Sequence, residues 1–137
     1  MRVGRIIALL LLVMIGVLGI SLIAHRIIPS SEIRALPEQA TEVQEFYKNY
    51  GLDHVYVIKA KMPQHLVEAY AQKVGAEHEK SSGKMPMSFS SIETGGFPDR
   101  PGWWSPPSEI LFFYNEPGFY RTIGWADGYM YYEEGSW

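Results

Sequence analysis

Hydrophobic and polar positions divide the chain into an apolar N-terminal run and a longer part of mixed character. The run, residues 6–24 (IIALLLLVMIGVLGISLIA), contains no charged residue. Nineteen helical residues at a rise of about 1.5 Å each span roughly 28 Å, close to the hydrocarbon thickness of a bilayer. A helix satisfies its own backbone hydrogen bonds, so lipid can surround it. The pattern predicts a single-pass transmembrane helix that contacts the bilayer through residues 6–24.

A cleaved signal peptide is the alternative interpretation of this run. The apolar core of a signal peptide is usually about 7–15 residues, which is shorter than the run observed here. The candidate cleavage site, Leu22-Ile23-Ala24, places a large residue where a small one is preferred. The chain has no cysteine, which excludes lipoprotein processing. We therefore expect an uncleaved anchor over residues 1–28.

The basic residues around the run indicate its orientation. Arg2 and Arg5 precede it, and Arg26 and Arg34 follow it. The positive-inside rule therefore favours a cytoplasmic N-terminus by a small margin. A short basic tail also stays inside more easily than a large domain does. We expect the C-terminal part to lie outside the cytoplasm.

The first segment beyond the anchor is predicted to be a helix. Residues 29–37 (PSSEIRALP) form a spacer between two prolines. In residues 38–49, Ala40, Val43, Phe46 and Tyr47 recur at helical spacing and give one apolar face. Pro37 suits the first turn of a helix, and Gly51 follows its end.

The remaining segments alternate between strand and helix patterns. Residues 53–61 (DHVYVIKAK) are typical of a strand. A second helix is predicted to begin at Pro63 and to end at Gly75, with an apolar stripe between them. Strands are further predicted over residues 87–93 and 109–115, separated by a proline-rich and glycine-rich loop over 94–107. An Asp-Gly pair at 127–128 between the apolar runs 119–125 and 129–133 predicts a β-hairpin.

Early helices followed by late strands favour an α+β fold. We expect an antiparallel sheet of four or five strands with one or two helices packed on one face. About 110 residues beyond the anchor suffice for one domain. The predicted organisation is an anchor over 1–28, a spacer over 29–37 and a small extracytoplasmic domain over 38–137.

Charge restricts the partners of this domain. The chain has 12 basic and 15 acidic residues, and three of the basic ones, Arg2, Arg5 and Arg26, flank the apolar run. Nine basic and fifteen acidic residues remain, a formal charge of −6. Nucleic acid binding requires a basic surface, so we expect no nucleic acid partner.

Aromatic residues are the main candidates for binding. Of the 19 Phe, Trp and Tyr residues, 13 fall between Phe97 and Trp137. Packing in a small core accounts for most of them, but aromatic rings also stack on sugars and anchor protein interfaces. Neighbouring residues in an extended chain point in opposite directions, so we expect one ring of the Trp103-Trp104 pair to pack inward and the other to face outward. The candidate binding residues are Trp103, Trp104, Tyr114, Trp125 and Tyr129.

Catalytic and metal-binding signatures are missing from the sequence. It contains no H-E-x-x-H, no G-x-S-x-G and no phosphate-binding G-K-[ST], and its four histidines have no ligand spacing. Glu133 and Glu134 are expected on opposite faces of a strand, as surface charges. For a hydrolase, the weak nominees are Asp99, Arg100, Glu109 and Asp127. We expect no catalytic residue, no metal and no cofactor.

The sequence therefore predicts a membrane-tethered, non-enzymatic binding domain. Its partner is expected to be an envelope protein or a cell-wall polymer, and the aromatic C-terminal half is the expected contact surface. Two alternatives stay open. One is a small subunit of a membrane complex that contacts its neighbours through the anchor, and the other is a cell-envelope hydrolase.

Overall fold

A computed structural model describes residues 7, 10–16, 29–76, 89 and 99–136. The chain divides into two units, residues 1–34 and 35–137, and each is considered by itself. In the first unit, residues 10–16 are helical, and the rest of the apolar run lies almost entirely outside the described residues. Within the described part of the chain, no helix is long and apolar enough to cross a membrane.

A short helix follows at the boundary between the two units. It is α2 (Ser31–Ala35), and the Ile33 N–H donates to the Ser30 Oγ at 3.1 Å. Serine at this position satisfies a backbone donor that the first turn leaves without a helical partner.

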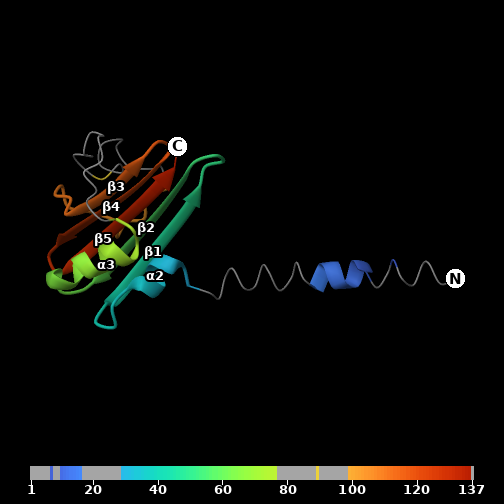
Figure 1. Ribbon diagram of the computed structural model, residues 1–137, viewed down its shortest axis with the longest axis horizontal. Helices are drawn as coiled ribbons and strands as arrows, with labels where there is room; N and C mark the ends of the chain where they lie inside the picture. Colours follow the sequence, from blue (N-terminus) through green and yellow to red (C-terminus); the bar gives the residue numbers. More distant parts are fainter. Residues whose placement is uncertain (1–6, 8–9, 17–28, 77–88, 90–98, 137) are drawn as a thin grey trace. The chain divides into compact units, whose positions relative to one another are not determined.

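The second unit contains a five-stranded antiparallel sheet in the order β1-β2-β5-β4-β3 (Figure 1). The strands are β1 (Thr41–Asn49), β2 (His54–Lys61), β3 (Phe112–Glu116), β4 (Phe119–Ala126) and β5 (Tyr129–Ser136). A 3-10 turn, η1 (Gln64–Leu66), leads into α3 (Val67–Lys73) after β2. The predicted α+β domain with an antiparallel sheet is confirmed.

The predicted helix over residues 38–49 is wrong, because this segment forms the strand β1. Gly51 has a φ of 99°, which favours glycine, and the Tyr50 N–H donates to the Asp53 carbonyl at 2.8 Å across a two-residue turn. That turn brings the segment alongside β2, where Phe46 pairs with Val57. Helical spacing of a few apolar residues is a weak signal, and pairing with a neighbouring strand overrides it.

The other predictions agree more closely with the structure. The strand over 53–61 and the helix between Pro63 and Gly75 are confirmed as β2 and as η1 with α3. The hairpin around Asp127-Gly128 is confirmed as well, since both residues have the positive φ, 53° and 87°, that a type I′ turn requires. The strand predicted over 109–115 begins later, at Phe112, while that predicted over 87–93 lies outside the described residues except for Phe89.

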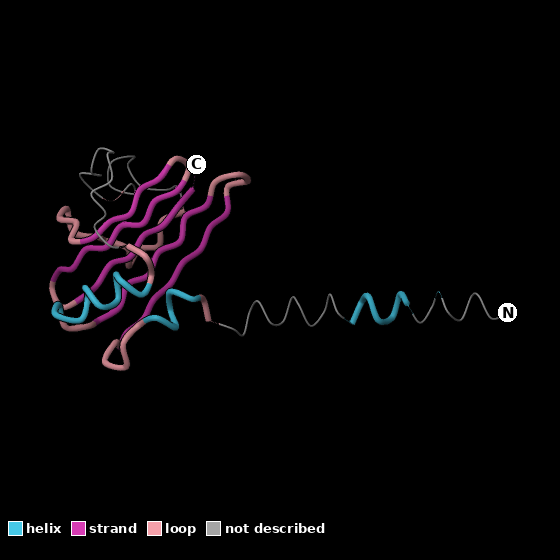
Figure 2. Tube along the Cα trace, in the orientation of Figure 1, coloured by secondary structure: helices cyan, strands magenta, loops and turns pink. Residues whose placement is uncertain are grey.

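The two faces of the sheet are covered differently. On what we call the helix face, α3 lies across the strands (Figure 2), and the Tyr70 ring contacts Tyr132 edge-on at 6.1 Å between centroids. Val67, Tyr70 and Ala71 of α3 are buried there. On the opposite face, called the loop face, part of the connection between α3 and β3 covers the sheet. Val57, Phe89, Trp104 and Tyr131 form the buried aromatic core of this face.

The two adjacent tryptophans differ in burial, as the sequence predicts. Trp104 is 1% exposed and contacts Phe89 and Tyr131 at centroid distances of 5.9 and 5.6 Å. Trp103 is only partly buried and packs against the outside of the same aromatic core. Trp104 therefore has a packing role, and a ligand could reach only Trp103.

We expect Trp104→Ala to lower the free energy of unfolding by about 3–5 kcal/mol, because it leaves a large cavity beneath the connection. Trp103→Ala is the matched control and should lower the free energy of unfolding by less than half as much. Urea unfolding of the full chain in detergent, followed by intrinsic fluorescence, measures both losses. Equal losses for the two variants would contradict the assignment of Trp104 alone to the core.

Candidate functional site

An open groove at one end of the sheet is a candidate site in the described part of the second unit. It has a volume of about 360 Å³ and is open to solvent on one side. Small-molecule sites in proteins begin at about 300 Å³, so the groove could hold one sugar ring or one side chain of a partner. Its lining residues are Gln39, Thr41, Lys61, Met62, Pro63, Trp125 and Gly128.

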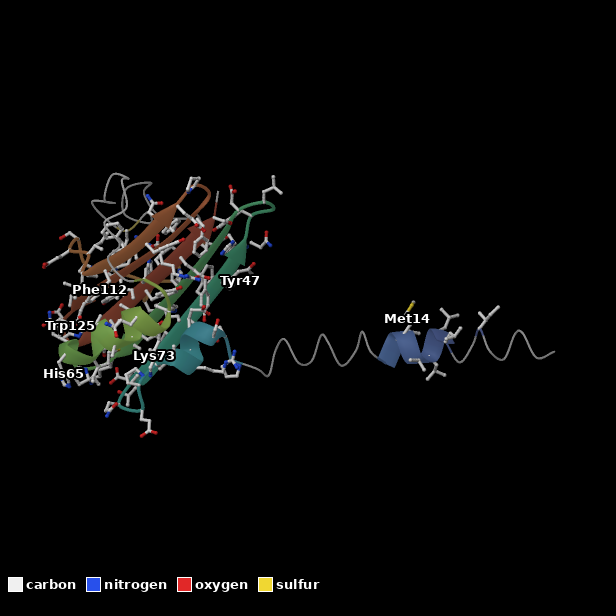
Figure 3. All side chains as sticks on the ribbon, viewed as in Figure 1. Met14, Tyr47, His65, Lys73, Phe112 and Trp125 are labelled. Atoms are coloured by element: carbon white, nitrogen blue, oxygen red, sulfur yellow. The ribbon has the colours of Figure 1, made fainter. Side chains whose placement is uncertain are left out.

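Trp125 provides the aromatic surface of this groove (Figure 3). Its indole N–H donates to the Met62 carbonyl at 2.9 Å, which ties β4 to the end of β2. The Met62 N–H in turn donates to the Gly128 carbonyl at 3.0 Å in the β4–β5 turn. Because both bonds link segments far apart in sequence, the ring is held in place before any ligand arrives.

A charged cluster lies at the rim of the groove. The Lys61 Nζ lies 2.8 Å from Glu42 Oε1, and the Tyr129 hydroxyl donates to Glu42 Oε2 at 2.6 Å. Lys59 adds a cation above the Tyr129 ring, with its Nζ 4.5 Å from the centroid. The hydrogen bonds from Lys61 and then from Tyr129 lower the pKa of Glu42, and the bond to Glu42 raises the pKa of Lys61. Of this cluster, Lys61 lines the groove, and its ammonium group is paired with the Glu42 carboxylate.

Three of the five predicted binding residues lie in or against the buried core of the loop face: Trp104 belongs to that core, and Trp103 and Tyr129 pack against it. Trp125 lines the groove, and Tyr129 pairs with the neighbouring Ala126 and contacts the rim cluster. Tyr114 lies on β3, at the edge of the sheet, where it donates to Glu116 at 2.7 Å. Trp103 and Trp104 belong to the loop face. The structure does not bring the five residues together as one surface.

A second polar cluster occupies the part of the helix face beyond α3. Glu134 accepts hydrogen bonds from the Tyr132 hydroxyl and, at 3.2 Å, from the Arg121 Nε. Arg121 also stacks on the Phe119 ring, with the guanidinium carbon 4.8 Å from its centroid. Burial, and then the charge of Glu134, raises the pKa of Tyr132 far above its ordinary value. The contacts join β4 and β5 and indicate a stabilising network.

Histidine and serine at the edge of this cluster do not complete a catalytic triad. His54 Nδ1 and Ser136 Oγ lie 2.7 Å apart. The other ring nitrogen, Nε2, is 4.0 Å from Glu134 Oε1, which is beyond hydrogen-bond distance. A nucleophile, a base and an orienting acid need to be linked by hydrogen bonds in sequence. Ser136 is therefore bonded to His54 without the orientation that catalysis requires.

The nominated hydrolase residues are not among the residues that line the groove. Asp99 forms an ion pair with Lys48 at 2.9 Å, and Asp127 occupies the β4–β5 turn. None of Asp99, Arg100, Glu109 and Asp127 lines the groove. Among the described residues, no group of three or more His, Asp or Glu side chains could hold a metal ion.

Two features escaped the sequence analysis. Glu133 and Glu134 do point to opposite faces, but neither is a surface charge: Glu133 is fully buried, and its Oε1 accepts a hydrogen bond from the Tyr120 hydroxyl at 2.9 Å. The prediction was wrong because it counted net charge and did not consider the position of β5 inside the sheet. The second feature is a group of exposed apolar side chains on β1 and its turn, Val43, Tyr47, Tyr50 and Leu52. Recognising residues 41–49 as a strand would have revealed it.

The raised pKa of Tyr132 predicts a loss of stability at alkaline pH. In the unfolded chain a tyrosine ionises near pH 10, whereas the folded state keeps Tyr132 protonated. The contribution of Tyr132 to the free energy of unfolding is therefore complete below about pH 10. It falls as the pH rises further, by at most about 1.4 kcal/mol per pH unit. We expect Tyr132→Phe to reduce this alkaline slope in urea unfolding between pH 8 and 11. An unchanged slope in the variant would show that Tyr132 does not cause it.

The fold and this geometry were compared with known proteins. No protein-family model, no curated protein and no solved structure matches the chain. The candidate function is accordingly argued from the residues of this chain alone.

Proposed function

We propose that this protein is a membrane-tethered binding domain that recognises a cell-wall polymer through the groove containing Trp125. The observation that carries the proposal is the fixed Trp125 ring, whose N–H is bonded to Met62 O at 2.9 Å beside a groove of about 360 Å³. A ring held in this way offers its face to a ligand at little cost in conformational entropy.

The lining of the groove suits a sugar ring. Carbohydrates present apolar C–H faces that stack on aromatic rings and hydroxyl groups that need polar partners. Trp125, Met62 and Pro63 supply apolar surface, while Gln39, Thr41 and Lys61 supply donors and acceptors. The lysine and carboxylate at the rim, Lys61 and Glu42, can also bond to the charged or amide substituents of an envelope polymer.

The proposed tether comes from residues 6–24. Their uncharged composition supports an anchor, and the short spacer over 29–37 would keep the domain close to the membrane surface. A tethered site works at high effective concentration, so a groove of modest affinity would suffice for a repetitive polymer. An envelope protein that inserts one apolar side chain is the alternative occupant of the same groove.

We expect Trp125→Ala to weaken binding of the full chain to isolated cell-wall polymer by at least about tenfold, which is about 1.4 kcal/mol. Cosedimentation of the detergent-solubilised protein with peptidoglycan or other insoluble wall polysaccharide measures the change. Tyr114→Ala is the matched control, since it removes another partly exposed ring that is distant from the groove.

Two outcomes would contradict the proposal. One is equal loss of binding in both variants, which would indicate a general effect on folding. The other is wild-type binding by Trp125→Ala, provided that its urea unfolding midpoint stays close to that of the wild type.

A further inference from the structure

Among the described residues, the strand β1 lies at an edge of the sheet and is paired on one side. In the described part of the chain, β1 pairs with β2 and with no other strand. Seven of its nine residues are exposed, and Phe46 and Lys48 are the two that are partly buried. An exposed edge strand presents unpaired N–H and C=O groups, which form a template for another strand.

Edge strands are usually protected by free charged side chains, but those of β1 are paired with other residues of the same chain. Glu42 contacts Lys61 and Tyr129, as described above. Glu45 accepts a hydrogen bond from the Tyr56 hydroxyl at 2.7 Å, and Lys48 pairs with Asp99 at 2.9 Å. Each of the three charged groups therefore has a partner within the same chain. These contacts leave the outer edge of β1 with little charge repulsion against an incoming strand.

The exposed apolar side chains of the domain lie on the same strand. Among the described residues of the second unit, the large hydrophobic side chains classed as exposed are Val43, Tyr47, Tyr50 and Leu52, at 42%, 58%, 39% and 98%. All four belong to β1 or to its turn into β2. Figure 3 shows Tyr47 on β1, across the sheet from Trp125. This apolar stripe is separate from the groove.

The register of the hairpin identifies the backbone groups that face outward. The Tyr50 N–H donates to the Asp53 carbonyl, so residues 50 and 53 form a hydrogen-bonded pair. Hydrogen-bonded and non-hydrogen-bonded pairs alternate along an antiparallel ladder. Residues 44, 46 and 48 therefore bond inward to β2. The backbone groups of Glu45, Tyr47 and Asn49 point outward.

We propose that a second copy of this chain pairs antiparallel with β1, with Tyr47 opposite the partner's Tyr47. This register makes an outward-facing residue the centre of a two-fold contact, and it joins the two sheets into one. Such an interface is isologous, so each copy presents the same strand. The pairing goes beyond the proposed function, because it uses neither Trp125 nor the groove.

Side-chain chemistry favours a second copy as the occupant. In this register Glu45 lies opposite the partner's Asn49. The Asn49 Oδ1 already accepts a hydrogen bond from the Gly51 N–H at 2.7 Å, so its NH₂ group is the part suited to donate to a carboxylate. Val43 comes near the partner's Leu52 at each end of the pairing. In this register the exposed Tyr47 ring thus meets the same ring of the other copy.

The absence of cysteine from the chain allows a direct test. In a hydrogen-bonded antiparallel pair the two Cα atoms lie about 5.5 Å apart, within the range of about 4.4–6.8 Å that a disulfide accepts. We expect full-length Tyr47→Cys, in detergent or in lipid vesicles, to form a covalent dimer under mild oxidation. Leu52→Cys is the matched control. Residue 52 is more exposed than residue 47, but in this register it lies far from residue 52 of the second copy. The dimer of Tyr47→Cys should form at least about tenfold faster on non-reducing gels.

A second experiment retains Tyr47 and tests the register. Glu45→Cys and Asn49→Cys should cross-link when the two proteins are mixed, whereas Glu45→Cys alone should not. In that variant the two introduced cysteines lie four residues apart along the strands, roughly 13 Å. Cross-linking of the mixed pair supports the proposal even if Tyr47→Cys fails to dimerise. In that case, the Tyr47 ring itself is needed for the two strands to pair. Dimers of Tyr47→Cys and Leu52→Cys that form at equal, measurable rates would overturn the proposal, and so would the absence of a dimer with the mixed pair.

Discussion

Eight consecutive residue pairs join β2 to β5, from His54 with Ser136 to Lys61 with Tyr129. These strands come from the beginning and the end of the domain. Each also pairs with a neighbour to which a short turn connects it, β1 in one case and β4 in the other. Without the β2–β5 pairing, the domain would be two separate groups of strands. With it, they form a single sheet, and β5 lies in its middle.

The groove, the polar cluster and the free edge all follow from that pairing. It places the β4–β5 turn beside the end of β2, where Trp125 bonds to Met62 and the groove forms. It places Glu134 between His54 and Arg121 on the helix face. It also leaves β1 at the edge, with its apolar side chains exposed. The proposed binding and pairing surfaces are thus properties of one sheet order.

Local signals in the sequence predicted the parts of the fold that local chemistry determines. Asp127 and Gly128 adopt the positive φ of a tight turn, and Pro63 precedes the turn that leads into α3, because few other conformations suit these residues. The strand β1 was missed because its conformation depends on pairing with β2 across a turn marked only by Gly51. The burial of Glu133 was missed for a similar reason. It arises from strands on both sides of β5, one of them distant in sequence.

The candidate site was predictable only in part. Aromatic composition identified Trp125, but it could not separate Trp125 from Trp104, which lies in the core. The groove itself combines residues from position 39 to position 128, so no short motif could reveal it. Six of its seven lining residues became candidates only when the strands were placed in order: Gln39, Thr41, Lys61, Met62, Pro63 and Gly128.

Native-state hydrogen exchange of the full chain tests the central claim, that the β2–β5 pairing makes the domain one cooperative unit. Peptides covering residues 54–61 and 129–136 would be followed by mass spectrometry at increasing, sub-denaturing urea concentrations. The account predicts that the protected amides of both strands exchange through the same global opening, with one free energy and one urea dependence. Exchange of the β2 amides through a separate opening of lower free energy, while β5 stays protected by β4, would contradict it.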